Sequence, residues 1–381
     1  MKKFLALTLA LVMSLSLVAC GDKKTDDTKT DAPDQTEQPA ENEGAYKVAM
    51  ITDYGDITDQ SFNQTTYEAC KAFAEDNSIE FSYFRPAGDN TADRVAMIEK
   101  AVDEGFNVIV MPGYAFGGAI VEAAPEFPDV KFIALDVAAG DLLETAVAKA
   151  GESYDFNPSN WDLNKYVDMS NVYCAVYQEE LCGYMAGYAA VKLGYKQLGF
   201  LGGMAVPAVV RYGYGFVQGV NAAATELNIA DQVSVKYVYG NKFAPAPEIT
   251  AVMDTWYKGG TEVVFACGGG IYASAAEAAA KVEGAKVIGV DVDQAGIIDG
   301  KYGEGMTVTS AMKGLAPTVK TVLAAISADK WADFGGKIET LGLVSETPED
   351  NYVQLAGSTQ FADGFTQDDY KTLVASMFKG D

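Results

Sequence analysis

Histidine is absent from this chain of 381 residues. Its absence excludes Ser-His-Asp and Cys-His catalysis, histidine general bases, and zinc sites built on imidazole. Cysteine is scarce as well, and the five cysteines stand singly with no Cys-x-x-Cys pair, so neither a disulfide framework nor a metal cluster is indicated. We expect the cysteines of the folded body to be small buried hydrophobic residues.

Positive charge is the next shortage. The chain has 28 Lys and Arg against 53 Asp and Glu, a net charge of −25. So acidic a surface repels phosphate backbones and anionic lipid head groups. We therefore expect no nucleic-acid binding, and any attachment to a membrane must be covalent.

The N-terminus is typical of an exported lipoprotein. Two lysines precede the apolar run Phe4–Val18, which has the length of a signal-peptide core and is too short to span a bilayer. The run leads into the sequence LVACG (17–21), which is typical of a bacterial lipobox whose cysteine receives a diacylglycerol. We predict a signal peptide at 1–19 and lipidation of Cys20. The alternative is an ordinary secretion signal that happens to contain a cysteine.

A polar segment follows the predicted lipidation site. It is rich in Asp, Lys, Thr, Gln, Glu and Pro and has almost no apolar residue. Such a composition cannot bury enough surface to offset the entropy of ordering. We therefore predict that residues 20–45 are the lipidated cysteine and a disordered tether.

From residue 46 onward, short β-branched runs alternate with stretches rich in Ala and Glu. Strands that are apolar throughout and alternate with helices indicate parallel sheets covered by helices on both faces. About ten such strands exceed what one core usually holds, so we predict two α/β domains. The predicted boundaries are 46–170 for an N-terminal lobe, 171–310 for a C-terminal lobe and 311–381 for segments that cross back and pack on both lobes.

Two similar runs, FIALD (132–136) and VIGVD (287–291), place Asp136 and Asp291 at the carboxyl ends of buried strands. Open α/β sheets hold their ligands at this edge. Asp291 would accept hydrogen bonds from vicinal hydroxyl groups. Lys313, which follows the next predicted strand, can pair with Asp291 and reach the same ligand. Two such domains face to face would form a cleft walled by strand ends.

The stretch ITDYGDITDQSFNQ (51–64) supplies a second group of polar residues. Asp53 ends the first strand, and Phe62 and Asn63 begin a helix. An aromatic ring beside an amide and a carboxylate suits a flat polar heterocycle, stacked on its face and hydrogen-bonded along its edge. The aspartates of the stretch are three residues apart, which does not match an EF-hand-type calcium loop. We expect the remaining acidic and hydroxyl residues, Asp56, Asp59 and Ser61, to shape the turn and cap the helix.

Two further features lie in the second half of the chain. Arg211 follows a glycine-rich strand end that lacks the Gly-Lys-Ser/Thr of a phosphate loop, and we expect Arg211 to donate to hydroxyls or a carbonyl. The run Cys-Gly-Gly-Gly (267–270) ends another buried strand. Its glycines, Gly269 among them, either let the backbone approach a ligand closely or form a plain tight turn.

These stretches together resemble the basic membrane protein family of bacterial lipoproteins, the substrate-binding components of ABC importers. The resemblance is greatest to the purine nucleoside receptor A group. The motifs that carry it are ITDYGDITDQSFNQ (51–64), VMPGYAFGGAI (110–120), FLGGMAVPAVVRYGYGFVQGV (200–220), FACGGG (265–270), VIGVDVDQ (287–294) and TSAMKG (309–314).

The resemblance implies a two-lobed type I periplasmic-binding-protein fold, each lobe a parallel sheet flanked by helices, with a ligand cleft between the lobes. Family members stack a nucleoside base on the aromatic at the Phe62 position and read its edge with the residues at Asp53 and Asn63. The positions of Asp291 and Lys313 hold the ribose hydroxyls.

Relatives with this fold also place a second aromatic at the position of Phe243. The chain has Tyr114 where the family often has Phe, and it has Arg211 alone where the family often has two adjacent basic residues. Since some relatives take flavins, the exact ligand stays open.

The function implied is that of a lipid-anchored, extracytoplasmic, monomeric receptor that delivers a nucleoside to an ABC permease and its ATPase, with no enzymatic activity, cofactor or metal. One alternative is an extracellular nucleoside hydrolase-like enzyme, which would need a dense aspartate cluster holding calcium. Another is a ligand sensor or surface antigen built on the same fold.

Overall fold

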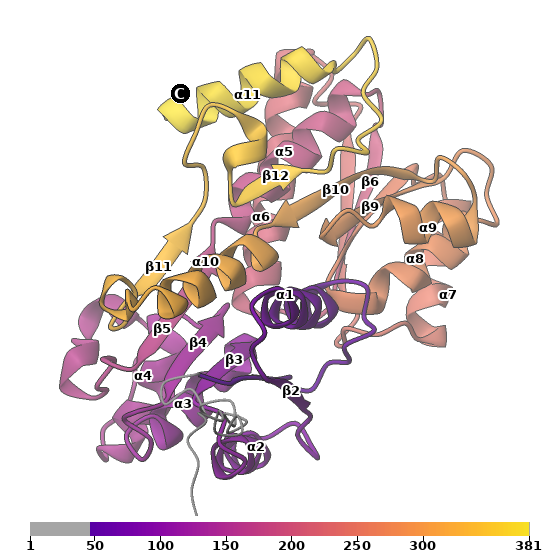
Figure 1. The fold of residues 1–381 in the computed structure, drawn as a ribbon. Coiled ribbons are helices and arrows are strands. Elements are labelled where there is room, and N and C mark those ends of the chain that lie inside the picture. Colours follow the sequence, from indigo (N-terminus) through magenta and orange to yellow (C-terminus); the bar gives the residue numbers. More distant parts are fainter. Residues whose placement is uncertain (1–45, 381) are drawn as a thin grey trace, which may run out of the picture. The chain divides into compact units, whose positions relative to one another are not determined.

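A computed structural model describes residues 46–380 of the chain. These residues form two six-stranded sheets, each flanked by helices, and we refer to each sheet with its helices as a lobe (Figure 1). The predicted signal peptide (1–19), the lipidation site Cys20 and the tether (20–45) lie outside the described residues.

The first sheet has the strand order β11-β5-β4-β3-β1-β2, and all its pairs are parallel. Every residue of β1 and β3 is buried, because helices cover both faces of the sheet. Its strands are β1 (Val48–Ile51), β2 (Phe81–Phe84), β3 (Val108–Pro112), β4 (Lys131–Leu135), β5 (Val172–Tyr177) and β11 (Ile338–Leu341).

The second sheet repeats this plan with the order β12-β10-β9-β8-β6-β7. Its pairs are parallel except that β12 runs antiparallel to β10 at the edge. Its strands are β6 (Gln197–Gly202), β7 (Ser234–Tyr239), β8 (Val263–Cys267), β9 (Lys286–Asp291), β10 (Thr307–Lys313) and β12 (Val353–Leu355).

Helices connect the strands of both sheets, and α1 packs against α10 (Figure 1). The α-helices are α1 (Phe62–Asp76), α2 (Thr91–Asp103), α3 (Gly117–Ala123), α4 (Ala139–Lys149), α5 (Glu179–Lys192), α6 (Pro207–Glu226), α7 (Pro247–Lys258), α8 (Tyr272–Ala279), α9 (Ala295–Tyr302), α10 (Leu315–Ser327) and α11 (Gln367–Lys379).

Each sheet reverses its strand order at one point. In the first lobe β1 lies between β2 and β3, and in the second β6 lies between β7 and β8. At such a reversal, the connections that leave two adjacent strands run to opposite faces of the sheet. A crevice therefore opens between them, at the carboxyl ends of the strands. The stretch 51–64 leaves β1 at the crevice of the first lobe, as the sequence predicts.

The chain divides between the lobes differently from the prediction. The strand β5 belongs to the first sheet, although we placed the lobe boundary at residue 171, and β11 extends the same sheet. The alternation of strands and helices is the same in both lobes, so it does not reveal which sheet receives a strand. The strand β10 also continues to Lys313, which is therefore the last residue of the strand rather than part of the following loop.

Three segments cross between the lobes, after β5, after β10 and between β11 and β12. Backbone bonds tie them together: the Gln178 N–H donates to the Leu341 carbonyl over 2.9 Å, and the Gly314 N–H donates to the Tyr352 carbonyl over 2.7 Å. The Tyr177 hydroxyl donates to Thr318 Oγ1 over 2.9 Å. Such a bundle of short connections is the usual structure of a hinge between two rigid bodies.

Helices α5 and α6 pack backbone against backbone. Gly183 and Gly187 on α5 face α6, and Gly215 and Gly219 on α6 face α5. A Cβ added at any of these four positions would lie between 1.9 and 2.2 Å from a carbonyl oxygen of the other helix. Glycines four residues apart on both helices therefore set the close approach of the pair.

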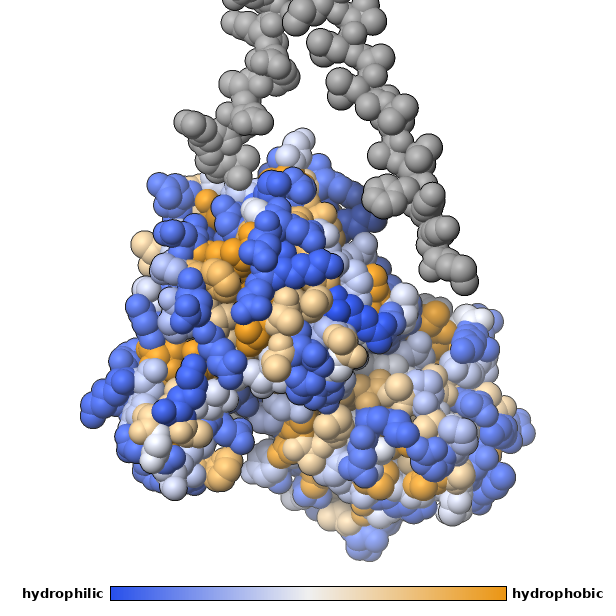
Figure 2. Space-filling model, turned by 90° about the horizontal axis from the view of Figure 1, so that it is seen from below, coloured by the Kyte–Doolittle hydropathy of each residue, from blue (hydrophilic) through white to orange (hydrophobic). Residues whose placement is uncertain are grey.

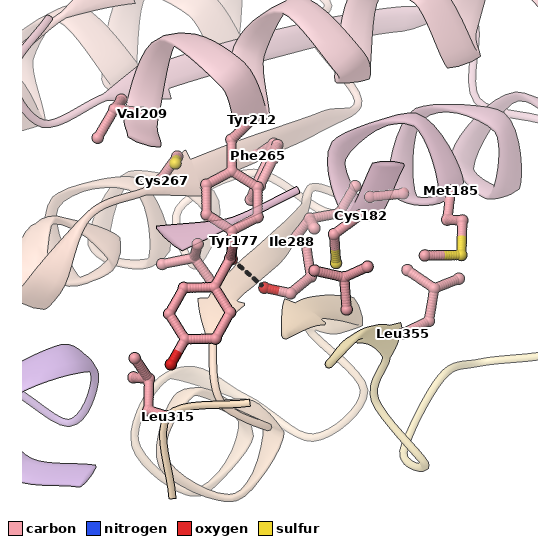
Figure 3. Close-up of a cluster of buried hydrophobic side chains, with 14 of the residues drawn as sticks. Tyr177, Cys182, Met185, Val209, Tyr212, Phe265, Cys267, Ile288, Leu315 and Leu355 are labelled. Atoms are coloured by element: carbon pink, nitrogen blue, oxygen red, sulfur yellow. Dashed lines mark hydrogen bonds between the residues drawn. The ribbon is translucent and has the colours of Figure 1, made fainter. Parts of the chain in front are cut away.

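Beneath these helices lies an apolar core that reaches the hinge (Figure 3). Tyr212 projects from α6 against Phe265 of β8, with ring centroids 5.8 Å apart, and donates its hydroxyl to the Ala311 carbonyl over 3.3 Å. Cys182 and Met185 project from α5 toward β12 in the same view. The cysteines of the described body are all buried and unpaired, as expected: Cys70, Cys174, Cys182 and Cys267.

Hydrophilic side chains cover most of the face shown in Figure 2, with apolar residues scattered among them. From residue 46 to residue 380, no helix combines the length and the apolar character needed to cross a bilayer.

The α5 and α6 packing predicts the effect of one methyl group. Gly187→Ala should lower the free energy of unfolding by ~2 to 3 kcal/mol, because the added carbon forces two backbones apart. Gly300→Ala, in α9, is the control, since its added Cβ would meet no described atom within 4 Å. It should instead raise stability slightly, by ~0.5 to 1 kcal/mol. Urea unfolding of both variants measures the difference, and equal effects would contradict the packing.

Candidate functional site

A cavity of about 770 Å³ lies between the carboxyl ends of the two sheets. The predicted ligand-binding residues line it with one exception, Arg211, which does not reach the cavity. The lining residues among those predicted are Asp53, Phe62, Asn63 and Asp136 from the first lobe and Phe243, Gly269, Asp291 and Lys313 from the second.

Asp53 leaves β1 with one carboxylate oxygen already occupied. Its Oδ1 accepts the N–H groups of Tyr54 and Gly55 over 2.6 and 2.8 Å. Its Oδ2 lies near Gly113, where an added Cβ would approach within 2.6 Å; the φ of +130° at Gly113 also favours glycine. Burial raises the pKa of Asp53 to about 6, although the two N–H groups and Arg94 lower it.

Asn63 is held in one orientation by Asp59. The Asp59 carboxylate accepts the backbone N–H groups of Ser61, Asn63 and Gln64 over 2.9, 3.0 and 3.1 Å, so it caps α1. It also accepts Asn63 Nδ2 over 3.2 Å. The Asn63 Oδ1 is buried and has no hydrogen-bond partner among the described residues. Asn63 itself lines the cavity, but this oxygen is closed off from solvent.

Ser61 does not cap the helix, contrary to the prediction. Its side chain makes no capping bond to α1. Instead Ser61 Oγ donates to Asp291 Oδ2 over 2.5 Å, which joins the first lobe to the second. A second bond of this kind runs from Gln294 Nε2 to the Gln60 carbonyl over 3.0 Å. Asp59 takes the capping role because it stands two residues before Ser61 and reaches three N–H groups at once.

Lys313 is a buried cation surrounded by carboxylates of both lobes. Its Nζ lies 2.5 Å from Asp136, 3.4 Å from Glu179 and 3.7 Å from Asp291. Burial lowers the pKa of Lys313, but the three carboxylates outweigh burial and raise it above its ordinary value. The predicted pairing with Asp291 is present, but the closest partner is Asp136.

Glu179, at the start of α5, was not among the predicted site residues. It is fully buried, and its carboxylate binds both Lys313 and Arg211, the latter over 2.6 Å. Arg211 thus pairs with a buried carboxylate, and it is not among the residues that line the cavity. Two adjacent glutamates at a helix start look like ordinary first-turn residues in the sequence, so they gave no signal of this role.

Asp136 and Asp291 occupy equivalent places in the two lobes. Asp136 directly follows the central strand β4, and Asp291 is the last residue of the central strand β9. Both have left-handed backbone conformations, with φ of 61° and 64°. Few non-glycine residues adopt this conformation, and it is frequent at functional sites. Asp136 Oδ1 is buried, and the described part of the chain offers it no hydrogen-bond partner.

Phe62 and Phe243 are aromatic rings of opposite lobes. Lys313 Nζ lies 4.6 Å from the centroid of the Phe62 ring. Gly203 and Gly268 make room for Phe243, because a Cβ added to either would lie 2.3 or 2.6 Å from its ring. The glycine run at 268–270 therefore accommodates Phe243, and the added Cβ of Gly269 would lie 2.8 Å from the Phe243 carbonyl oxygen.

Tyr54 is another aromatic residue that lines the cavity, and the sequence reasoning missed it. Its ring lies nearly parallel to that of Phe243, at 21°, with centroids 6.3 Å apart. Its hydroxyl donates to Met204 Sδ over 3.6 Å, again across the lobes. Arg94 packs near the same ring, with Cζ 5.9 Å from the centroid. A tyrosine in a turn gives no sign of which side chains it will meet, so only the fold reveals this contact.

The comparisons with known proteins agree with this geometry. Residues 46–352 match the family model Bmp, described as ABC transporter substrate-binding protein PnrA-like. The chain belongs to this family. The predicted relationship to basic membrane proteins and the two-lobed fold are thereby confirmed.

Individual known proteins are similar to this chain over most of its length. The ABC transporter nucleoside-binding protein BmpA of Lactococcus lactis is 24% identical, over 96% of this chain and 98% of its own length. The CD4+ T-cell-stimulating antigen of Listeria monocytogenes is 28% identical, over 88% of this chain and 86% of its own. An ABC transporter solute-binding protein of Aeropyrum pernix shares the fold with a TM-score of 0.64 and 18% identity, over 88% of this chain and 86% of that one.

The buried cation at the hinge predicts a strong effect on stability. Lys313→Met should lower the free energy of unfolding at neutral pH by ~3 to 5 kcal/mol, because three buried carboxylates lose their shared partner. Lys281→Met is the control: this exposed lysine pairs with Asp254 on the surface, and its loss should leave the unfolding midpoint nearly unchanged. Chemical denaturation measures both. A Lys313→Met protein as stable as wild type would contradict the proposed electrostatics.

The raised pKa of Asp53 predicts a pH-dependent gain in the variant Asp53→Asn. The wild type loses stability as pH rises from about 4 through 6, since the folded state must then ionise a buried carboxyl group. The variant avoids this loss and should be more stable by up to ~3 kcal/mol above pH 7, with the difference vanishing near pH 4. Urea unfolding between pH 4 and 8 tests it, with exposed Asp363→Asn as the control. A constant difference at all pH values would contradict it.

Proposed function

We propose that this chain is a lipid-anchored, extracytoplasmic receptor that captures a purine nucleoside and delivers it to an ABC permease and its ATPase. Membership of the Bmp family supports the part that concerns substrate binding for an ABC transporter. The name of the Lactococcus lactis relative, a nucleoside-binding protein, is consistent with the ligand class. The lipobox at Cys20 supports the anchor.

The presence of two chemically different kinds of side chain in one cavity is the observation that carries the proposal. The carboxylates Asp136 and Asp291 around Lys313 suit the vicinal hydroxyls of a ribose. The aromatic rings that line the same cavity with Asp53 and Asn63 suit a stacked and edge-read heterocycle. A nucleoside satisfies both kinds of group together, whereas a sugar leaves the rings uncovered and a free base leaves the carboxylates without donors.

The hinge and the bonds between the lobes support a mechanism of closure around the ligand. Ser61 with Asp291, and Lys313 with Asp136, join the lobes beside the cavity. A ligand that bridges the same carboxylates and rings adds contacts that exist only when the lobes are together, so its binding favours the closed form. The closed form is then the one that the permease would recognise. The mechanism involves no bond making.

The proposal predicts a specific ligand profile. Purine nucleosides at 100 times their Kd should stabilise the protein by about 2.7 kcal/mol, whereas ribose and free purine bases at equal concentration should shift its melting temperature far less. Differential scanning fluorimetry with isothermal titration calorimetry measures this. Equal shifts with ribose alone would contradict base stacking. Incubation with inosine should leave the nucleoside intact, and steady release of hypoxanthine by chromatography would favour the hydrolase alternative.

Asp291 is the residue whose loss should most weaken the hydrogen bonds to the ribose of the proposed ligand. Asp291→Asn keeps the shape but removes the charge that accepts from hydroxyl groups, so affinity should fall by about 100-fold. Asp293→Asn, two residues away and exposed, is the matched control and should bind as wild type does. Circular dichroism verifies the fold of both. Unchanged affinity in Asp291→Asn would remove the ribose assignment.

A further inference from the structure

We infer that Gln294 is a latch residue: its side-chain amide joins the second lobe to the backbone of the first outside the ligand cavity, and it keeps the lobes together whether or not a ligand is present. The role goes beyond the proposed function, because it concerns the lobes themselves and not the identity of the ligand. It follows from the way in which both partners of one hydrogen bond are fixed, Gln294 in the second lobe and Gln60 in the first.

The Gln294 side chain is fixed within its own lobe. Gln294 is buried in the turn between β9 and α9. Its Oε1 accepts the Val290 N–H over 3.0 Å, and its own backbone N–H donates to Ser310 Oγ over 3.1 Å. Rotation of the amide by 180° would direct its NH₂ group at the Val290 N–H, where two donors would repel each other. The fold therefore presents Nε2, a donor, to the first lobe.

The acceptor in the first lobe is fixed as well. Gln294 Nε2 donates to the Gln60 carbonyl over 3.0 Å. The backbone N–H and the side-chain Nε2 of Gln60 both donate to Gln64 Oε1, over 3.0 and 2.7 Å, at the start of α1. Gln60 also has a left-handed backbone with φ of 56°, which few non-glycine residues adopt. Two fixed groups therefore meet, one from each lobe, and neither has to be ordered when the bond forms.

The bond between Gln60 and Gln294 is separate from the ligand cavity, since neither residue is among those that line it. Three other bonds between the lobes each include at least one lining residue: Ser61 with Asp291, Lys313 with Asp136, and Tyr54 with Met204. A ligand in the cavity can compete with those three bonds for donors and acceptors. It leaves the bond of Gln294 in place, so this bond contributes to closure independently of the ligand.

The bond favours the closed form because it exists only there. When the lobes part, water can hydrogen-bond both the Gln60 carbonyl and the Gln294 amide. If the donor is removed, the carbonyl loses its partner in the closed form alone, and such a loss is worth about a factor of ten in an equilibrium constant. The equilibrium between the lobes should therefore shift toward the open form by about tenfold.

Two variants, Gln294→Met and Gln294→Glu, give the test. Methionine has about the size of glutamine but no N–H donor. Glutamate retains an acceptor for the Val290 N–H, so it keeps the bond within the second lobe. At pH 8 it either turns an anionic oxygen toward the Gln60 carbonyl or takes up a proton in the closed form only. Both disfavour closure, so Gln294→Glu should open the lobes further than Gln294→Met does.

Gln360 carries the matched controls, Gln360→Met and Gln360→Glu. Its Nε2 also donates to backbone carbonyls, those of Gly305 and Thr307 over 2.9 and 2.8 Å, but all three residues belong to the second lobe. The controls therefore lose the same kind of bond and leave the contact between the lobes intact. Stopped-flow displacement measures the release of guanosine, and small-angle X-ray scattering at pH 8 measures the radius of gyration of the protein without ligand.

We expect Gln294→Met to release guanosine about tenfold faster than the wild type does, and Gln294→Glu to release it faster still. Without ligand, Gln294→Glu should have a larger radius of gyration than the wild type, because its lobes part. Both Gln360 variants should match the wild type in both measurements.

Release of guanosine at the wild-type rate by both Gln294 variants would overturn the latch. So would an equal acceleration by the Gln360 variants, which would show that general loosening of the second lobe, not a bond between the lobes, sets the rate. If folded wild-type protein binds no nucleoside, the proposed function fails, and the scattering without ligand then decides on the latch. A larger radius of gyration in Gln294→Glu supports it, and a radius equal to that of the wild type overturns it.

Discussion

The arrangement of the cleft depends on one buried ammonium group, that of Lys313. It is the last residue of β10, at the point where the chain leaves the second sheet for the first. Its three carboxylate partners come from the residue after β4, from α5 and from the end of β9. A cation in such a place is stable only when it is paired, and the carboxylates need it equally. The two lobes therefore meet at a charge cluster beside the hinge. Arg211 adds a second cation through Glu179 and stays outside the cavity.

The cluster also determines what the cavity can bind. Lys313 is engaged by Asp136 at 2.5 Å, and buried acceptors on Asp136 and Asn63 have no partner within the described body. A buried acceptor without a donor is costly, so under the proposed function the hydroxyl donors of a ligand would offset part of this cost. Burial of Asp53 reduces the stability of the protein, and under the proposed function it strengthens the hydrogen bond that this carboxylate would accept from a ligand.

Most of the fold could be predicted from the sequence because its strands are apolar throughout and its helices follow them in strict alternation. From residue 46 onward the structure shows the predicted alternation of strands and helices. The sheet that receives β5 could not be predicted, since a parallel strand of either lobe has the same pattern. The close packing of α5 against α6 could not be predicted either. In the sequence its glycines resemble those of flexible loops, and only the fold shows that the two helices contact each other at these positions.

Some residues of the candidate site could likewise be predicted from the sequence, and others could not. Strand-end aspartates at 136 and 291 and the aromatic and amide at 62 and 63 could be predicted, because a parallel sheet brings its carboxyl ends to one edge. Tyr54, Glu179 and the turn of the Asn63 amide could not, since each depends on contacts between segments far apart in the chain. Ser61 is the clearest example of a residue whose role the sequence does not reveal. Its position in the sequence predicts a helix cap, but in the fold its hydroxyl donates to Asp291 of the other lobe.

The central claim is that the carboxylates and the aromatic rings of the cavity together hold one nucleoside. Native mass spectrometry of the protein purified without unfolding, before and after addition of a guanosine excess, tests it most directly. The account predicts one bound species per chain, with the mass of a purine nucleoside, that is lost when the protein is denatured. A bound free sugar or flavin that guanosine does not displace, or an empty protein that takes up no guanosine, would contradict it.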